Sequence, residues 1–202
     1  MVSIGAVADT TLAPGGQSGT RFGTDQTLAL AADSSNTSKL RTALLAFALP
    51  DIGTRTLGDA TLELTLTADS KASADILHVY GIADTNWTDD ATNGARWSDV
   101  TNLRTLADGS KYAQIADNPV QFLKDGKLDP ALRVAATALV SSTSLRFDLT
   151  DYLKEAVKSG QKRISLLVVR EVNHHTETLS FAAAARSRES DCGGPVLTLR
   201  AF

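Results

Sequence analysis

Apolar and polar residues alternate most clearly between positions 40 and 67, where the sequence reads LRTALLAFALPDIGTRTLGDATLELTLT. Two runs there carry an apolar side chain at every second position: Leu45, Phe47 and Leu49 in the first, and Leu62, Leu64 and Leu66 in the second. A period of two is typical of a strand that buries one face. Pro50 ends the first run because proline cannot donate to a β-ladder. Turn-forming residues separate the two runs, so we expect a hairpin against which a second layer packs.

The same patterns predict further strands at residues 2–12, around Leu28 and Leu30, and at 75–84, 132–140, 144–149, 164–170, from 179 and at 196–200. The run ISLLVVR at 164–170 is the most apolar and is expected at the centre of a sheet. Helices are predicted at 119–124 and at 151–160, the second capped by Thr150 and ended by Gly160. Many short strands with one or two small helices predict an all-β fold, a jelly-roll-like β-sandwich, in one domain over residues 1–202.

Composition narrows the classes of partner. With 20 basic and 23 acidic residues, a net charge of −3 gives no overall attraction for nucleic acid or an anionic membrane, and neither is an expected partner. Any anion site must therefore be local. Cys192 is the only cysteine, so no intrachain disulfide forms. The N-terminus lacks the features of a signal peptide, and strand-like residues directly after Met1 suggest a module taken from a larger chain.

Seven short motifs occur in a recognisable order: ADTTLAP, FGTDQTLAL, LRTALLAFALPDI, DATLEL, VYGIADTNWTDD with GARW, FDLTDYL, and FAAAARSRE with PVLTL. From about residue 8 to residue 199 the chain resembles the DNRLRE-type domain, also described as carbohydrate-binding module family 96. The resemblance implies a secreted, non-catalytic β-sandwich that binds an acidic, uronate-containing polysaccharide, most often alginate. It also implies a neighbouring catalytic domain, a polysaccharide lyase, in the same larger chain. The alternatives are a structural or adhesive extracellular surface domain and a small polysaccharide lyase.

A uronate polymer carries one carboxylate per sugar, so its binder needs Arg or Lys, with the planar fork of Arg favoured. Seven residues form the predicted ligand site: Arg21, Lys39, Arg41, Arg96, Trp97, Arg186 and Arg188. Each basic residue has an alternative as a solvated or structural charge, and Arg41 as a partly buried arginine paired with Glu189 or an aspartate. Trp87 and Trp97 either anchor their polar loop or stack on a sugar.

Metal and catalytic motifs are sparse. No HxxxH, HExxH or paired-cysteine spacing favours zinc. Four carboxylates lie close together in the sequence, which leaves a structural calcium ion as an alternative to plain surface charges: Asp84, Asp89, Asp90 and Asp99. A lyase would need a base and a group that neutralises the uronate carboxylate, for which the candidates are His78, Tyr80, Arg170 and His175. No nucleophile elbow or nucleotide fingerprint occurs, so we expect no catalytic residues and no required cofactor.

Overall fold

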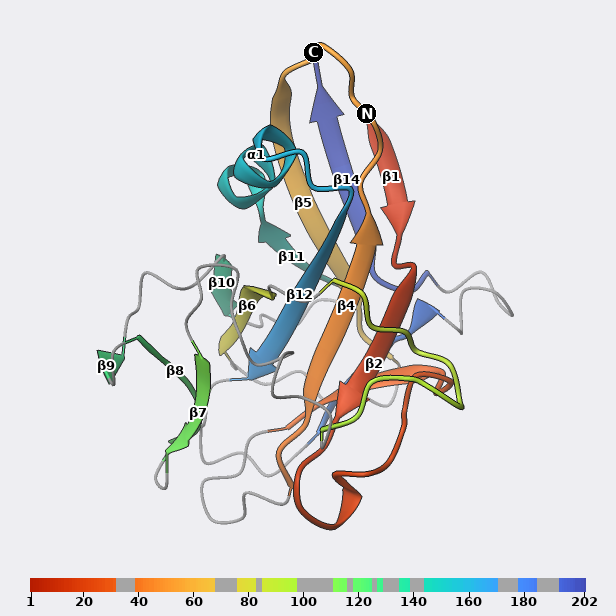
Figure 1. Ribbon diagram of the computed structural model, residues 1–202, viewed down its shortest axis with the longest axis vertical. Coiled ribbons are helices and arrows are strands. Elements are labelled where there is room, and N and C mark those ends of the chain that lie inside the picture. The colour runs from red at the N-terminus through yellow and green to blue at the C-terminus, as the bar shows by residue number, and fades with distance from the viewer. Residues whose placement is uncertain are drawn as a thin grey trace.

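A computed structural model of the chain (Figure 1) describes residues 1–31, 39–67, 76–82, 85–97, 144–170, 178–184 and 193–202, and the backbone of four strands between 111 and 138. The strands of the first half are β1 (Val2–Gly5), β2 (Ala8–Leu12), β3 (Thr27–Leu30), β4 (Thr42–Ala48), β5 (Leu57–Thr65) and β6 (Ile76–Ile82). Those of the second half are β7 (Lys111–Ile115), β8 (Asn118–Lys124), β9 (Lys127–Leu128), β10 (Ala135–Ala138), β11 (Ser144–Asp148), β12 (Arg163–Arg170), β13 (Leu179–Ala182) and β14 (Val196–Ala201). The described helices are the 3₁₀ turn η1 (Gly15–Gln17) and α1 (Thr150–Lys158).

Two antiparallel sheets make up most of the molecule. A four-stranded sheet has the order β1-β14-β5-β11, and a five-stranded sheet has the order β10-β6-β12-β4-β2. The chain passes repeatedly from one sheet to the other, in the manner of a jelly roll. Two smaller sheets, β13-β3 and β7-β8-β9, complete the described strands. The predicted all-β sandwich is confirmed, and β12 lies at the centre of its sheet as its apolar sequence predicts.

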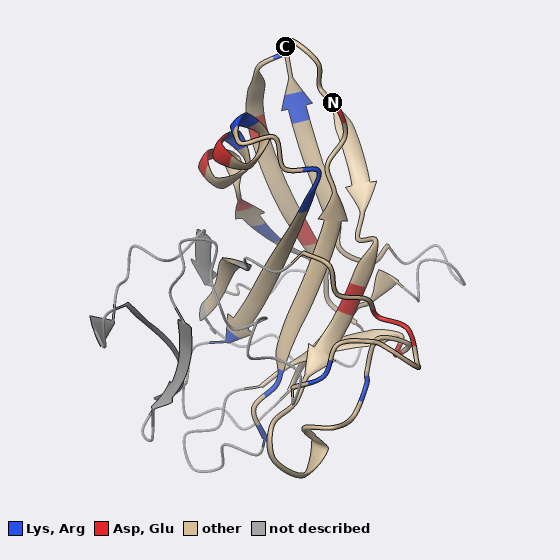
Figure 2. Cartoon of the chain, in the orientation of Figure 1, with Lys and Arg blue, Asp and Glu red and all other residues tan. Residues whose placement is uncertain are grey.

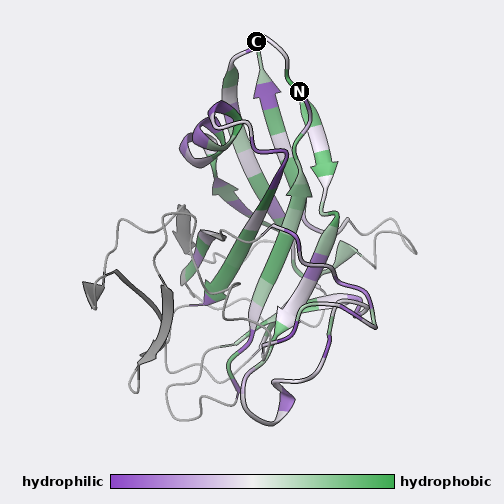
Figure 3. Cartoon of the chain, in the orientation of Figure 1, coloured by the Kyte–Doolittle hydropathy of each residue, from purple (hydrophilic) through white to green (hydrophobic). Residues whose placement is uncertain are grey.

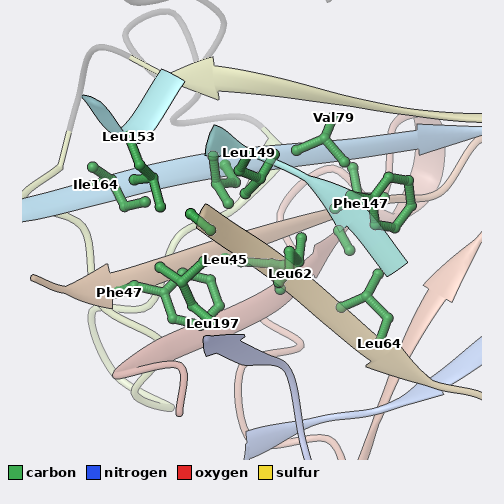
Figure 4. Packing of buried hydrophobic residues seen from close by; sticks show 14 of the residues in the cluster. Leu45, Phe47, Leu62, Leu64, Val79, Phe147, Leu149, Leu153, Ile164 and Leu197 are labelled. Atoms are coloured by element: carbon green, nitrogen blue, oxygen red, sulfur yellow. The ribbon is translucent and has the colours of Figure 1, made fainter. Parts of the chain in front are cut away.

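The main core lies between the two sheets. Leu45 and Phe47 of β4 pack with Leu62 and Leu64 of β5, and Leu197 of β14 joins them (Figure 4). All five side chains are at most 1% exposed. This is the face that the period-two alternation predicts, and the hydrophobic positions follow the strands in Figure 3. Aliphatic burial at about 25 cal/mol per Å² stabilises the sandwich.

A second apolar cluster, which we call the outer cluster, covers the outer face of the five-stranded sheet. The segment 85–97 crosses this face in front of β4 and β2 (Figure 1). Its apolar side chains pack on outward-facing residues of the sheet, and the cluster comprises Ala8, Leu12, Leu40, Leu44, Ala46, Tyr80, Trp87, Ala95, Trp97, Leu167 and Val169. Strand β4 is therefore buried on both faces, which explains why its sequence TALLAFA is apolar at nearly every position.

Two predictions of strand pairing are wrong. The strands at 40–49 and 57–67 do not form a hairpin, because β4 pairs with β12 and β2 whereas β5 pairs with β14 and β11. The connection between them crosses from one sheet to the other. The single strand expected at residues 2–12 is two strands, since β1 pairs with β14 and β2 pairs with β4. The alternation of apolar and polar residues identifies the buried face of each strand. It is the same whether the two strands pair in a hairpin or lie in different sheets.

Two predictions about helices are also wrong. Residues 119–124 belong to strand β8, which pairs with β7 and β9. In the sequence NPVQFLK, Val120 and Phe122 share one parity with polar Gln121 between them, which fits a strand. Thr150 does not cap α1 but is its first residue, and its backbone N–H donates to Asp148 Oδ1 at 2.9 Å. The Thr150 hydroxyl instead accepts from the backbone N–H of Ala60 at 3.0 Å, which ties α1 to β5.

Candidate functional site

Three segments that are distant in sequence meet at one end of the sandwich: residues 13–26, 39–41 and 85–97. Figure 2 shows their Lys and Arg positions at the lower end of the view, away from both ends of the chain. The basic residues of these segments are Arg21, Lys39, Arg41 and Arg96. We call these four residues the basic cluster. They are four of the seven residues that the sequence predicts for the ligand site.

Close backbone contacts hold the three segments together. Arg41 pairs with Ala31 through two backbone hydrogen bonds of 3.0 and 3.1 Å, which fixes the entry to β4. Gly23 lies against the backbone of Asp89, and a Cβ atom at Gly23 would overlap the Asp89 carbonyl oxygen. The segments 13–26 and 85–97 therefore form one packed surface, and a larger residue than glycine would separate them.

Arg41 is the best-defined member of the basic cluster. Its side chain is half-buried, and its Nη1 donates to the backbone carbonyl of Leu40 at 2.7 Å. Its Nη2 donates to the side-chain oxygen of Gln17 in η1. Partial burial lowers the pKa of Arg41 from its ordinary value, but a guanidinium stays charged at neutral pH. The structure thus presents a cation in a fixed orientation.

Hydrogen bonds hold the pKa of Asp90 below its ordinary value, chiefly the bond from the backbone N–H of Asn93 and the bond from the Thr88 hydroxyl. The nearby charge of Arg21 makes a smaller contribution in the same direction. The hydrogen bonds to Asp90 from Thr92 and Asn93 close the turn that precedes Arg96. Lys39 is exposed, whereas Arg21 and Arg96 are half-buried.

Both tryptophans are buried in the outer cluster. Trp87 Nε1 donates to the Ser165 hydroxyl at 2.9 Å, and Arg163 donates to the Trp87 carbonyl at 2.8 Å. Arg163 also lies over the Trp87 ring, 5.9 Å from its centroid. Trp97 is 9% exposed. The sequence leaves two roles open for each tryptophan, anchoring its loop or stacking on a sugar, and the burial of both rings favours anchoring. The contact of Trp97 with a ligand stays a prediction.

Arg186 and Arg188 lie outside the described residues, as does Glu189, the proposed partner of Arg41. The residues on either side of this segment are described. The backbone N–H of Ala184 donates to the buried carboxylate of Asp9 at 2.6 Å. A Cβ atom at Gly194 would lie 2.8 Å from Ala184 Cα, so the chain before and after this segment is in close contact.

The acidic residues of the 85–97 segment have structural hydrogen bonds. Asp89 Oδ2 accepts from the backbone N–H of Asp9 at 3.2 Å, and Asp90 accepts from Thr88 and Thr92 at 2.7 and 2.9 Å. Among the residues that the structure describes, no group of three or more His, Cys, Asp and Glu gathers. Asp84 and Asp99 lie outside those residues, so structural calcium stays a prediction.

The candidate lyase residues that are described do not share one face of the sheet. His78 and Tyr80 of β6 lie near each other, with ring centroids 6.3 Å apart, and Tyr80 belongs to the outer cluster. Arg170 lies on the same face of β12 as Leu166 and Val168, which belong to the main core. His175 lies outside the described residues. If His78 or Tyr80 acted as the base of a lyase, Arg170 would therefore lie on the opposite face of the sheet and could not neutralise the uronate carboxylate beside it.

Three residues of this region have no counterpart in the sequence prediction: Gln17, Gly23 and Asp9. Gln17 contacts Arg41, Gly23 contacts Asp89, and Asp9 contacts both Asp89 and Ala184. Each contact joins segments that are distant in sequence. For Gln17 and Gly23 the one signal in the sequence is composition. The stretches PGGQSG and RFGTD are typical of tight loops, in which the backbone can lie close to a neighbouring segment.

Comparison with known proteins agrees with this description. None of the helices within the described part of the chain has the length and apolar character needed to cross a membrane. No curated protein matches the sequence. The family model of carbohydrate-binding module family 96 matches residues 1–113, which is more than half of the chain and includes the whole basic cluster. The chain therefore belongs to carbohydrate-binding module family 96.

Proposed function

We propose that this module binds an acidic, uronate-containing polysaccharide, with alginate as the first candidate, through the basic cluster. The observation that carries the proposal is that three segments in contact with one another carry Arg21, Lys39, Arg41 and Arg96 at one end of a chain whose net charge is −3. Such a local concentration of positive charge favours an anionic polymer over a neutral one. Family membership supports a carbohydrate as the ligand.

The chemistry of the cluster fits carboxylates. Guanidinium groups bind a carboxylate through two parallel hydrogen bonds, and a charge-assisted bond contributes about 1.5–3 kcal/mol. The buried tryptophan rings offer little surface for stacking, so charge supplies most of the binding free energy. Binding should therefore weaken as ionic strength rises.

Calorimetric titration with alginate oligosaccharides at low and moderate salt tests the proposal, with a neutral glucan as the control ligand. We expect binding to alginate only, weaker at moderate salt. Arg41→Ala and Arg96→Ala should each weaken it about ten-fold or more, as the loss of one charge-assisted bond predicts. Arg186→Ala with Arg188→Ala should also weaken binding without lowering the melting temperature.

Arg146→Ala and Arg200→Ala are matched controls. Both arginines are exposed on the four-stranded sheet, where they pair with Glu63 at 3.1 Å and Asp59 at 3.8 Å. Removing either should leave the affinity unchanged. Equal losses in cluster and control variants would show nonspecific attraction. No binding by the folded protein would favour a structural or adhesive domain, and ultraviolet-absorbing products would favour a lyase.

We further propose that the module is secreted and holds an attached polysaccharide lyase near its substrate. A linked binding site raises the local concentration of substrate without high affinity of its own. A lyase fused to the module should therefore degrade an alginate gel faster than the lyase alone, and both should degrade short soluble oligosaccharides equally. Equal rates on the gel would contradict this role.

A further inference from the structure

Strand β1 forms one edge of the four-stranded sheet. In the described part of the chain, β14 is the one strand that pairs with it. The outer side of β1 therefore presents backbone N–H and C=O groups without a ladder partner. Two backbone hydrogen bonds fix the chain directly after the strand: Ala6 N–H donates to the carbonyl of Pro195 at 3.1 Å, and Val7 N–H donates to the carbonyl of Ala46 at 2.8 Å. The strand is thus a fixed edge.

The other edges of the two main sheets whose side chains are described are protected. Strand β11, at the far edge of the four-stranded sheet, carries the exposed charges of Arg146 and Asp148. Strand β2, at an edge of the five-stranded sheet, is buried along its whole length, and the backbone N–H of Asp9 donates to Asp89 of the 85–97 segment. Charges and covering segments are common means of keeping an edge strand from pairing with another chain.

Strand β1 has neither form of protection. No charged side chain occurs in residues 1–8, MVSIGAVA. Among the described residues four large apolar side chains are exposed, and three of them lie in this stretch: Met1 at 86%, Val2 at 39% and Val7 at 44%. The fourth, Phe202, follows β14, the neighbour of β1. An uncharged strand could cover this edge without burying an unpaired charge.

We infer that β1 is a dimerisation surface, at which β1 of one copy pairs antiparallel with β1 of a second copy. Antiparallel pairing of a strand with itself has two-fold symmetry, so each copy supplies the same donors and acceptors that it receives. No like-charged side chains meet, because the strand has none. The two four-stranded sheets join into one, and both outer edges of that sheet are β11. The charges of β11 then stop further growth, so the assembly closes as a dimer.

This inference goes beyond the proposed function and does not depend on it, because it concerns the protein without ligand. The strand contributes four residues from each copy. Such a contact is smaller than a standard interface, so we expect a weak dimer with a Kd of roughly 10–100 μM. Since the contact is uncharged, added salt should not weaken the dimer, in contrast to the binding of alginate.

Sedimentation velocity of the free protein between about 1 μM and 1 mM tests the inference. The wild type should show a monomer–dimer equilibrium. Val2→Lys should weaken dimerisation about ten-fold or more, because pairing brings the two added charges together. Val2→Thr stays uncharged and suits a strand, so it should keep the dimer. Gln161→Lys is the matched control for charge, since Gln161 is exposed beyond α1, and it should dimerise as the wild type does.

Hydrogen exchange of the wild type locates the contact without any variant, so the test stands even if Val2→Lys fails to fold. Amide protection in residues 2–5 should rise with protein concentration, whereas protection in β11 should stay constant. A protein that sediments as a monomer over the whole range would overturn the inference. A dimer that a folded Val2→Lys variant does not weaken, or whose concentration-dependent protection lies outside β1, would overturn it as well.

Discussion

At the scale of single residues, one buried carboxylate connects the parts that support the basic cluster. Asp9 of β2 is 1% exposed. Its Oδ2 accepts from Ala184 at 2.6 Å, and its backbone N–H donates to Asp89 at 3.2 Å. A buried charge of this kind is tolerated only when hydrogen bonds replace its lost hydration. Asp9 therefore links β2 to the 85–97 segment and to the end of β13.

Asp9→Ala should lower the free energy of unfolding by about 1.5–3 kcal/mol, because the Ala184 N–H loses a charged acceptor in a buried place. Urea denaturation of both proteins measures this difference. Asp9→Asn keeps one acceptor oxygen and should cost less. Asp59→Ala is the control, since its exposed ion pair with Arg200 spans 3.8 Å and should contribute about 1 kcal/mol or less. Equal losses at Asp9 and Asp59 would contradict the linking role.

Asp90 should make stability depend on pH. Hydrogen bonds from Asn93 and Thr88 hold the pKa of Asp90 below its ordinary value of 3.8, so the folded state prefers the charged form. This contribution is present above pH 3.8 and is lost as the pH falls through the folded-state pKa. Urea denaturation between pH 6 and pH 2 should therefore show a smaller loss of stability for Asp90→Asn than for the wild type. Parallel curves would rule out this contribution.

At the scale of elements, the sequence predicts strands better than their partners. The alternation of Leu62 and Leu64 identifies the buried face of β5, and the same alternation holds for β4. It does not distinguish a hairpin from a crossover between sheets, because both bury the same parity. The same limit applies to the prediction of the basic cluster, because the sequence identifies its residues but not their contacts. Residue type selects Arg21 and Arg41, whereas the contact of Arg41 with Gln17 and the proximity of Arg21 to Asp90 depend on tertiary packing.

The contact between the segments 13–26 and 85–97 gives a prediction of its own. Gly23→Ala places a methyl group on the Asp89 carbonyl oxygen, so the two segments must separate. Overpacking of this kind costs about 1–3 kcal/mol of stability, and alginate binding should weaken as the segment that carries Arg21 moves away from the segment that carries Arg96. Gly19→Ala is the control in the same segment, since its Cβ meets nothing within 4 Å. Urea denaturation and calorimetry compare the two variants, and equal behaviour would contradict the packing.

At the scale of the whole molecule, the two ends of the chain lie together and far from the basic cluster (Figure 2). Val2 pairs with Leu199, and Phe202 exchanges backbone hydrogen bonds of 3.0 Å with Thr56. A neighbouring protein fused to either end therefore attaches away from the proposed site. Immobilisation through the N-terminus and through the C-terminus should give equal affinities for alginate in a surface-binding measurement. A lower affinity on immobilisation through either terminus would indicate that the ligand binds near that terminus and not at the basic cluster.

The family match ends at residue 113, but the sheets do not. Strand β4 lies between β12 and β2, and β5 lies between β14 and β11, so residues 144–201 supply one partner of β4 and both partners of β5. A fragment of residues 1–113 would expose the core faces of β4 and β5 and leave β5 without a ladder, a state that apolar burial cannot stabilise. We expect its far-ultraviolet circular dichroism to be that of an unfolded chain, with no cooperative thermal transition, whereas the full chain melts cooperatively. Cooperative melting of the fragment together with alginate binding would mean that the half that matches the family model folds alone and that residues 144–201 merely extend its sheets.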